Sequence, residues 1–292
     1  MSAFEPGVPS PVRTSGRPRR RAARRLAILL PLGAVSLVMV VPLYLMLLMS
    51  LKTVDRVFAY PPDLWFTSLT FANFWEALFQ LIPFPLYLRN TAVISFLVIA
   101  GDLLSSSLVA YGFARYRFPG RDFLFMVLLS TMMVPFIVRL VPLFVLFKNL
   151  GWINTFLPLV VPPFFGTPLY IFLVRQFFLT IPGELLDAAR IDGCSEVGIW
   201  WRIMLPLARP VLAAVAILSF QTTWNDFLGP LVFLQKNEVR TVILGLNGLM
   251  GMFVEWNLVM AGVVAAVLPM ILIFFVFQRF FIKGIAVTGL KG

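Results

Sequence analysis

Six stretches of this chain are apolar over a length that can cross a lipid bilayer. They lie at about 27–50, 88–112, 123–147, 156–177, 211–234 and 261–281. A hydrocarbon core of roughly 30 Å needs about 20 residues of α-helix, and each stretch reaches that length. The pattern therefore predicts an all-α polytopic membrane protein with six transmembrane helices. The fourth stretch is expected to be broken by its prolines, which are Pro158, Pro162, Pro163 and Pro168.

The composition supports a membrane protein and narrows the chemistry open to it. Hydrophobic residues make up 60% of the chain and charged residues 13%, with a mean hydropathy of +0.92. There is no histidine, and Cys194 is the single cysteine, which argues against His-based acid–base catalysis, thiol–His pairs and nearly all zinc sites. No GxxxxGK(S/T) phosphate loop occurs. We therefore expect no catalysis and no bound cofactor in this chain, so any ATP is hydrolysed by another subunit.

The distribution of Lys and Arg predicts the orientation of the helices. Basic residues crowd the N-terminal arm and recur in alternate connections, and the remaining connections hold fewer of them. The basic residues assigned to the inner side beyond the arm are Arg115, Arg117, Arg121, Arg175, Arg190, Arg202, Arg209, Arg279, Lys283 and Lys291. Because cytoplasmic loops carry the excess of positive charge, both termini and the 178–210 loop are expected in the cytoplasm.

The remaining segments divide the chain into four parts. Residues 1–25 are basic and rich in proline, so we expect a disordered cytoplasmic arm rather than a nucleic-acid-binding tail or a cleaved signal peptide. Residues 26–87 hold the first transmembrane helix and an external segment. Residues 88–285 form the main transmembrane domain, with a second external loop at 235–260, and residues 286–292 form a cytoplasmic tail.

The stretch from Thr180 to Pro210 is the one cytoplasmic connection with a regular supply of charge. Its sequence is TIPGELLDAARIDGCSEVGIWWRIMLPLARP. The alternation of charged and small apolar residues predicts an amphipathic helix over 183–191, a break at Gly193, and a second helix that ends near Pro206. Spacing alone leaves open an interfacial helix that lies on the lipid.

A motif within this stretch points to a specific family. Asp187-Ala188-Ala189, then Gly193, then nine residues, then Ile203-x-Leu205-Pro206 resembles the EAA loop of binding-protein-dependent ABC importer permeases, with Asp187 in place of the usual Glu. In that family the loop is a coupling helix seated in a cleft of the ATPase subunit. The resemblance implies that this contact is made by Leu185, Asp187, Ala188, Ala189, Ile191, Asp192 and Gly193.

Other segments extend the resemblance over residues 88–292. The runs from Asn154 to Phe178, from Trp224 to Leu231 and from Gln278 to Gly292 are similar to carbohydrate-uptake permeases of the same family. The resemblance implies the type I ABC importer permease fold and a MalG-type subunit in a bacterial or archaeal cytoplasmic membrane. It also implies a second homologous permease (MalF-type), two ATPase subunits that use ATP and Mg²⁺, and an extracytoplasmic binding protein that delivers a sugar.

Three charged residues lie deep within the predicted helices, away from their ends, where charge is costly and often functional. They are Asp102, Arg139 and Asp226. Counted from the inner ends, Arg139 and Asp226 lie at similar depth, so the two can form a pair, and Arg139 can also reach toward Asp102. In one interpretation Arg139, Gln221, Asn225 and Asp226 face the path of a sugar, whose hydroxyls need both donors and acceptors. In the other they form a buried ion pair or a polar contact between helices.

Three alternatives to sugar import are considered. A glycerol-3-phosphate or polyol permease shares the same architecture, and Arg139 suits a phosphate. An ion-coupled secondary transporter requires an internal repeat and a midplane ion site, and no convincing repeat is present. An intramembrane enzyme is disfavoured by the absent histidines.

Overall fold

The computed structural model describes residues 17–67, 69–250 and 255–289. Within these ranges the regular elements are all helices, and no strand is present. The three longest are α1 (Arg17–Ser50), α4 (Phe84–Arg115) and α15 (Trp256–Gly289). The remaining main elements are α5 (Arg121–Ser130), α6 (Phe136–Asn149), α7 (Leu157–Val160), α8 (Pro168–Leu179), α9 (Glu184–Ile191), α10 (Glu196–Ile199), α12 (Arg209–Trp224), α13 (Leu228–Phe233) and α14 (Val242–Leu249).

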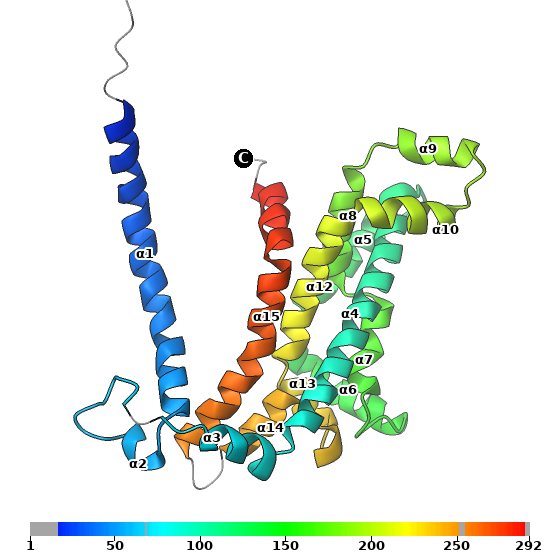
Figure 1. The fold of residues 1–292 in the computed structure, drawn as a ribbon. Coiled ribbons are helices and arrows are strands. Elements are labelled where there is room, and N and C mark those ends of the chain that lie inside the picture. Colours follow the sequence, from blue (N-terminus) through cyan, green and yellow to red (C-terminus); the bar gives the residue numbers. More distant parts are fainter. Residues whose placement is uncertain (1–16, 68, 251–254, 290–292) are drawn as a thin grey trace, which may run out of the picture.

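The bundle is built around α4. This helix packs along α8 and α12, and α12 in turn packs against α15. α1 stands beside the bundle and contacts α15 (Figure 1). The start of α1, the end of α15 and the pair α9 and α10 all lie at one end of the molecule, which we call the loop end. The opposite end carries α2 (Val54–Val57), α3 (Ala72–Trp75) and α14.

Six membrane crossings are present if bent helix pairs are counted as single spans. In the part of the chain that the structure describes, four segments cross by length and composition on their own: Ala27–Ser50, Phe84–Arg115, Leu157–Leu179 and Trp256–Val276. Two further pairs are bent, Arg121–Met133 with Phe136–Asn149 by 95° and Glu196–Leu207 with Arg209–Trp224 by 80°. In the second pair Glu196–Leu207 lies across the loop end (Figure 1), so we assign it to the loop and α12 to the span.

The third predicted span is not one straight helix. α5 continues into a 3₁₀ turn, η2 (Thr131–Met133), and α6 starts after Pro135. Val134 is extended, with φ −82° and ψ 111°, because the ring of the following proline disfavours the α conformation at that residue. Pro142 stays inside α6, so only the first of the two prolines bends the span.

The fifth predicted span, 211–234, is also divided. α12 ends at Trp224 and α13 begins at Leu228. Pro230 lacks the N–H group that would bond to the carbonyl of Asp226, which favours a break here, although α6 accommodates Pro142 without one. The break places Asn225 and Asp226 between two helix ends, a position that the prediction of a single helix did not provide.

The fourth span is broken, as its prolines predicted. α7 is followed by a 3₁₀ turn, η3 (Pro162–Phe165), and then by Gly166 with φ +99°. This positive φ favours glycine. A methyl group there would also lie 2.9 Å from Cδ1 of Ile171. α8 then starts at Pro168, which suits a first helical turn.

The predicted disordered arm is wrong for residues 17–25. α1 begins at Arg17. Pro18 fits in the first turn, because backbone N–H groups there have no partner within the helix and the one that proline lacks is not missed. Residues 1–16 of the arm and 290–292 of the tail lie outside the described residues, and α15 continues through 286–289.

The two external segments are folded rather than open loops. The first holds α2, α3 and a π-helix, η1 (Glu76–Leu81), and the second holds a 3₁₀ turn, η5 (Asn237–Val239), and α14. Asn90 of α4 donates hydrogen bonds to the carbonyls of Glu238 (2.9 Å) and Arg240 (3.0 Å). It therefore anchors the second segment to the bundle.

Candidate functional site: the helical loop and a polar cavity

The helix α9 has one face packed on its own chain and one face open. Leu186 and Ala189 are buried, whereas Leu185, Ala188 and Ile191 are exposed. Leu186 and Ala189 are three residues apart, so they share a side of the helix. The prediction that Ala189 faces a partner is therefore wrong, because it packs against the bundle. Ile191 is the most open of these residues, with 87% of its surface exposed.

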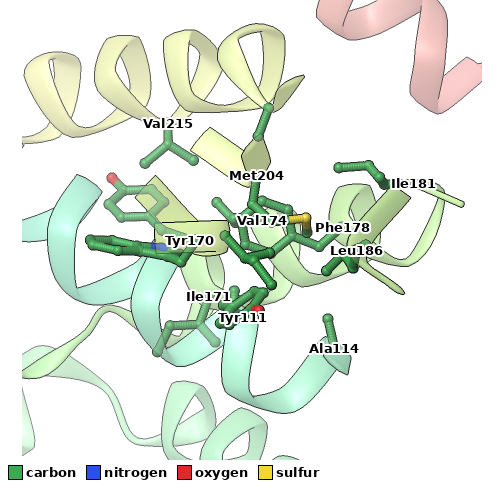
Figure 2. Packing of buried hydrophobic residues seen from close by; sticks show 14 of the residues in the cluster. Tyr111, Ala114, Tyr170, Ile171, Val174, Phe178, Ile181, Leu186, Met204 and Val215 are labelled. Atoms are coloured by element: carbon green, nitrogen blue, oxygen red, sulfur yellow. The ribbon is translucent and has the colours of Figure 1, made fainter. Parts of the chain in front are cut away.

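The buried face of α9 belongs to the largest apolar cluster of the molecule. This cluster joins the inner ends of α4, α8 and α12 to both helices of the loop. Figure 2 shows Leu186 among Val174, Phe178 and Met204. Such close packing leaves little freedom for the loop to move separately from the bundle. The loop is thus a rigid extension of the transmembrane helices.

Two polar contacts fix the two helices of the loop to each other and to α4, and a third lies within α9. Arg190 Nη1 lies 2.8 Å from Oδ1 of Asp187, and its Nε lies 2.8 Å from Oε1 of Glu196. The hydroxyl of Tyr111 donates to Oε2 of Glu196 at 2.7 Å. The Arg190 and Tyr111 hydrogen bonds together lower the pKa of Glu196 to about 2. Asp187 thus pairs within its own chain, at the edge of the exposed face.

The break after α9 takes the form that its glycine predicted. Gly193 has φ +79°, a left-handed conformation that costs other residues energy. Asp192 is exposed beside it, and the backbone N–H groups of Gly193 and Cys194 bond to the carbonyls of Arg190 and Ala189. Ser195 then caps α10 by accepting a hydrogen bond from the N–H of Gly198 at 3.2 Å. The helical stretch that follows ends at Leu207, close to the predicted Pro206.

A second candidate site is a polar cavity of about 210 Å³ inside the bundle. Asp102 of α4 is one of its lining residues and is only 3% exposed. Its two carboxylate oxygens accept hydrogen bonds at 2.6 Å from the hydroxyls of Thr167 and Ser219. Asp102 therefore ties three spans together. The other lining residues are Thr91, Ile94, Val98, Leu159, Pro163, Tyr170, Thr222, Thr223, Asp226, Pro230 and Thr241.

Asp226 reaches the same cavity from the break between α12 and α13. Its Oδ1 accepts a hydrogen bond from the N–H of Gly229 at 3.1 Å. Gly229 is held close by, because a methyl group there would lie 2.5 Å from Oδ2 of Asp226 and 2.9 Å from Cδ2 of Leu159. The carboxylate is thus positioned by the first turn of α13.

The remaining predicted pathway residues do not join this cavity. Arg139 is exposed on α6, with its guanidinium 6.0 Å from the Phe136 ring. Among the described residues it makes no ion pair with either Asp102 or Asp226, so the predicted Arg139–Asp226 pair is wrong. The 95° bend before α6 explains this result. The depth of Arg139 in the membrane was counted in residues along a straight helix, and this count is not valid for residues beyond the bend. Gln221 and Asn225 are exposed on α12, where the Asn225 amide donates to the Gln221 carbonyl at 2.8 Å.

Sequence reasoning missed the hydroxyl residues of the cavity and the tyrosine of the loop. Ser and Thr are tolerated throughout apolar helices, so no single-sequence signal separates Thr167 or Ser219 from their neighbours. The only sequence signal for these residues was Asp102, a charged residue within a predicted span. A buried carboxylate requires hydrogen-bond donors nearby. Tyr111 carried no signal of this kind. Across the described residues no group of three or more His, Cys, Asp or Glu is placed to hold a metal ion.

Comparison with known families gives a match over most of the chain. The family model described as "Binding-protein-dependent transport system inner membrane component" matches residues 103–287. That region includes the whole loop and the spans on both sides of it.

Several known permeases are similar along nearly their whole length. The arabinooligosaccharides transport system permease protein AraQ of Halalkalibacterium halodurans is 37% identical over 94% of this chain and 100% of its own. AraQ of Bacillus subtilis is 36% identical over 92% of this chain and 96% of its own. The sn-glycerol-3-phosphate transport system permease protein UgpE of Yersinia pestis is 32% identical over 85% of this chain and 91% of its own.

The fold is also found among solved structures. A chain from a bacterial ABC transporter involved in the import of the acidic polysaccharide alginate superposes with a TM-score of 0.75. The match covers 92% of this chain and 100% of that one, at 22% identity.

Proposed function

Because the chain belongs to the family of binding-protein-dependent transport system inner membrane components, we propose that it is the permease subunit of an ATP-driven importer for an oligosaccharide. It is a multi-pass protein of the cytoplasmic membrane. In this proposal the substrate is a sugar, and the loop is the part of the chain that couples ATP hydrolysis to transport.

The observation that carries the proposal is the exposed face of α9. Leu185, Ala188 and Ile191 present an apolar surface on a helix whose other face is locked into the bundle. Exposed apolar residues on a rigid base suit a contact with another protein. A movement of this face is passed to α4, α8 and α12, because α9 packs directly against the bundle and no flexible linker separates them.

The contact partner that we propose is an ATPase subunit, which binds ATP and Mg²⁺ and hydrolyses the nucleotide in trans. The loop end then faces the cytoplasm, in agreement with the excess of Lys and Arg there. A second, MalF-type permease, two ATPase subunits and an extracytoplasmic binding protein complete the complex. We propose that Gln221 of α12 and Asn225, the residue that follows this helix, face the path shared with the second permease; both are exposed.

The proposed substrate is an arabino-oligosaccharide or a sugar of similar size. The two AraQ proteins, at 37% and 36% identity, carry this inference. The second candidate is glycerol-3-phosphate, because UgpE of Yersinia pestis is 32% identical.

The test is uptake by the assembled complex in proteoliposomes, with its own binding protein outside and ATP inside. Radiolabelled arabino-oligosaccharide should accumulate, and unlabelled glycerol-3-phosphate should not compete. Absent sugar uptake together with ATP-driven accumulation of radiolabelled glycerol-3-phosphate would assign the chain to the second candidate.

A further inference from the structure

We propose that the polar cavity between α4, α8, α12 and α14 binds one monovalent metal cation of the sodium type. The site uses the Asp226 carboxylate and hydroxyl oxygens as ligands, and it is separate from the path of the transported sugar. The inference goes beyond the proposed function and does not depend on the identity of the substrate.

The first step is the charge of the cavity. Asp102 and Asp226 both line it, and none of its described lining residues is Lys or Arg. Neither carboxylate forms an ion pair within the part of the chain that the structure describes. Two acids in one membrane-embedded cavity are costly unless a positive charge accompanies them. The cavity thus has a place for a cation and no side chain that supplies one.

The second step is a hydroxyl that has no protein partner. Thr241 lines the cavity and is only 4% exposed, and its Oγ1 is buried without a hydrogen-bond partner. A buried hydroxyl left unpaired costs free energy. Its lone pairs are available to a ligand in the cavity.

The backbone on both sides of Thr241 is anchored. The carbonyl of Arg240 accepts from Asn90 at 3.0 Å, and the N–H of Val242 donates to Oγ1 of Thr91 at 2.9 Å. Both anchors come from α4, so the backbone that carries Thr241 is held against this helix. A ligand bound in the cavity would supply the missing partner of the Thr241 hydroxyl.

The third step is the choice of ligand. The donor atoms are carboxylate and hydroxyl oxygens, with no nitrogen or sulfur from His or Cys, and oxygen-only sites select hard cations. Both oxygens of Asp102 are already taken up by Thr167 and Ser219. Asp226, whose Oδ1 bonds to Gly229, supplies the direct carboxylate ligand through Oδ2. One carboxylate with neutral oxygens suits a single positive charge better than Ca²⁺, which takes six to eight oxygens.

The break in the fifth span adds to the negative potential. α12 ends at Trp224, beside Thr222 and Thr223 of the cavity wall. A helix C-terminus carries a partial negative charge and unpaired carbonyls, and interrupted membrane helices coordinate Na⁺ in this way. The length of the cavity along α4, from Thr91 to Asp102, is roughly 16 Å at 1.5 Å per residue, which leaves room for the ion and its waters.

The test measures sodium binding to the purified, fully assembled complex without sugar. Radioactive sodium should bind saturably with one high-affinity site per copy of this chain. Replacing choline chloride by NaCl at constant ionic strength should raise the melting temperature by a few degrees once NaCl is about tenfold above half-saturation.

Three variants make the result specific to this cavity. Asp226→Asn should abolish the sodium response, and Thr241→Val should weaken sodium affinity about tenfold. Thr241→Val removes no hydrogen bond within the protein, so it keeps the test valid if Asp226→Asn does not assemble. Asp55→Asn, at an exposed carboxylate of α2 whose side chain is 72% exposed, is the matched control and should respond as the unaltered complex does.

The proposal is overturned by an equal sodium response in Asp226→Asn, Thr241→Val and the control, or by no response in the unaltered complex. It is also overturned if acidification or added sugar gives the stabilisation that sodium does not. Failure of sugar uptake leaves the sodium measurement unchanged, so the two proposals fail separately.

Discussion

Arg190 and Glu196 are joined by an ion pair of 2.8 Å that links α9 to α10. The same carboxylate accepts a hydrogen bond from Tyr111 on α4. The loop is therefore bound to α4 by a polar contact and to the bundle by the apolar cluster that contains Leu186. We expect a force on the exposed face of α9 to reach the bundle through these contacts.

The first prediction concerns the response of this network to acid. Because the folded-state pKa of Glu196 is about 2, below its ordinary value of about 4.5, its contacts stabilise the loop fully above pH 4.5. That stabilisation is lost as the pH falls from 4.5 through 2. Hydrogen exchange of residues 184–207, corrected for intrinsic rates, should therefore accelerate across this window.

In Glu196→Gln the acceleration across that window should disappear. Glu184→Gln, at an exposed glutamate of α9 in the same loop, should retain it. Identical profiles in both variants would show that the pair does not hold the loop.

The second prediction concerns Gly193. Gly193→Val should destabilise the loop by about 1–2 kcal/mol or more, because φ +79° places Cβ too close to the carbonyl oxygen. Gly183→Ala is the control, since that residue has φ −65° and open space around it. Chemical denaturation of both variants provides the comparison, and equal free energies of unfolding would contradict the geometry.

The third prediction separates the observed position of Arg139 from the expected ion pair. Arg139→Met should not lower the free energy of unfolding by more than about 0.5 kcal/mol, because no ion pair among the described residues is lost and a membrane span loses a costly charge. Loss of one partner of a buried pair would cost about 3–5 kcal/mol instead. A denaturation curve of the single variant decides between these values.

The fourth prediction concerns the close approach of Gly229 to Asp226. Gly229→Ala should destabilise the protein by about 1–3 kcal/mol, because the new methyl group collides with the carboxylate and with Leu159. Gly112→Ala, near the C-terminal end of α4 where a methyl group would meet nothing within 4 Å, should be neutral or stabilising by about 0.5–1 kcal/mol. The same sign for both substitutions would contradict the packing described here.

Much of the fold could be predicted from sequence because bilayer-length apolar stretches leave few alternatives. The spans, the broken fourth helix and the turn at Gly193 all follow from hydropathy, proline and glycine. The bends at Pro135 and Asn225–Phe227 could not be placed, because the hydropathy of an apolar stretch is the same whether its helix is straight or interrupted.

Within the site, the loop was found and one of its faces was misassigned. Ala188 and Ala189 are both small, and the sequence does not show which of them packs against Phe178 and Met204. The cavity could not be predicted, because Thr167, Ser219 and Thr241 come together only through the packing of separate spans.

The central claim is that ATP-driven transport passes through the exposed face of α9. Ile191→Asp places a charge at its most exposed apolar residue, so the complex should insert and assemble normally. Val54→Asp, at an exposed valine of α2 on the opposite end, is the matched control.

The decisive measurement is sugar uptake by proteoliposomes of the two variants, with ATP inside or with a sodium gradient in its place. We expect ATP-driven uptake in the control, at least a tenfold loss in Ile191→Asp, and no uptake driven by sodium alone. Full ATP-driven uptake in Ile191→Asp, or accumulation on a sodium gradient without ATP, would contradict the account.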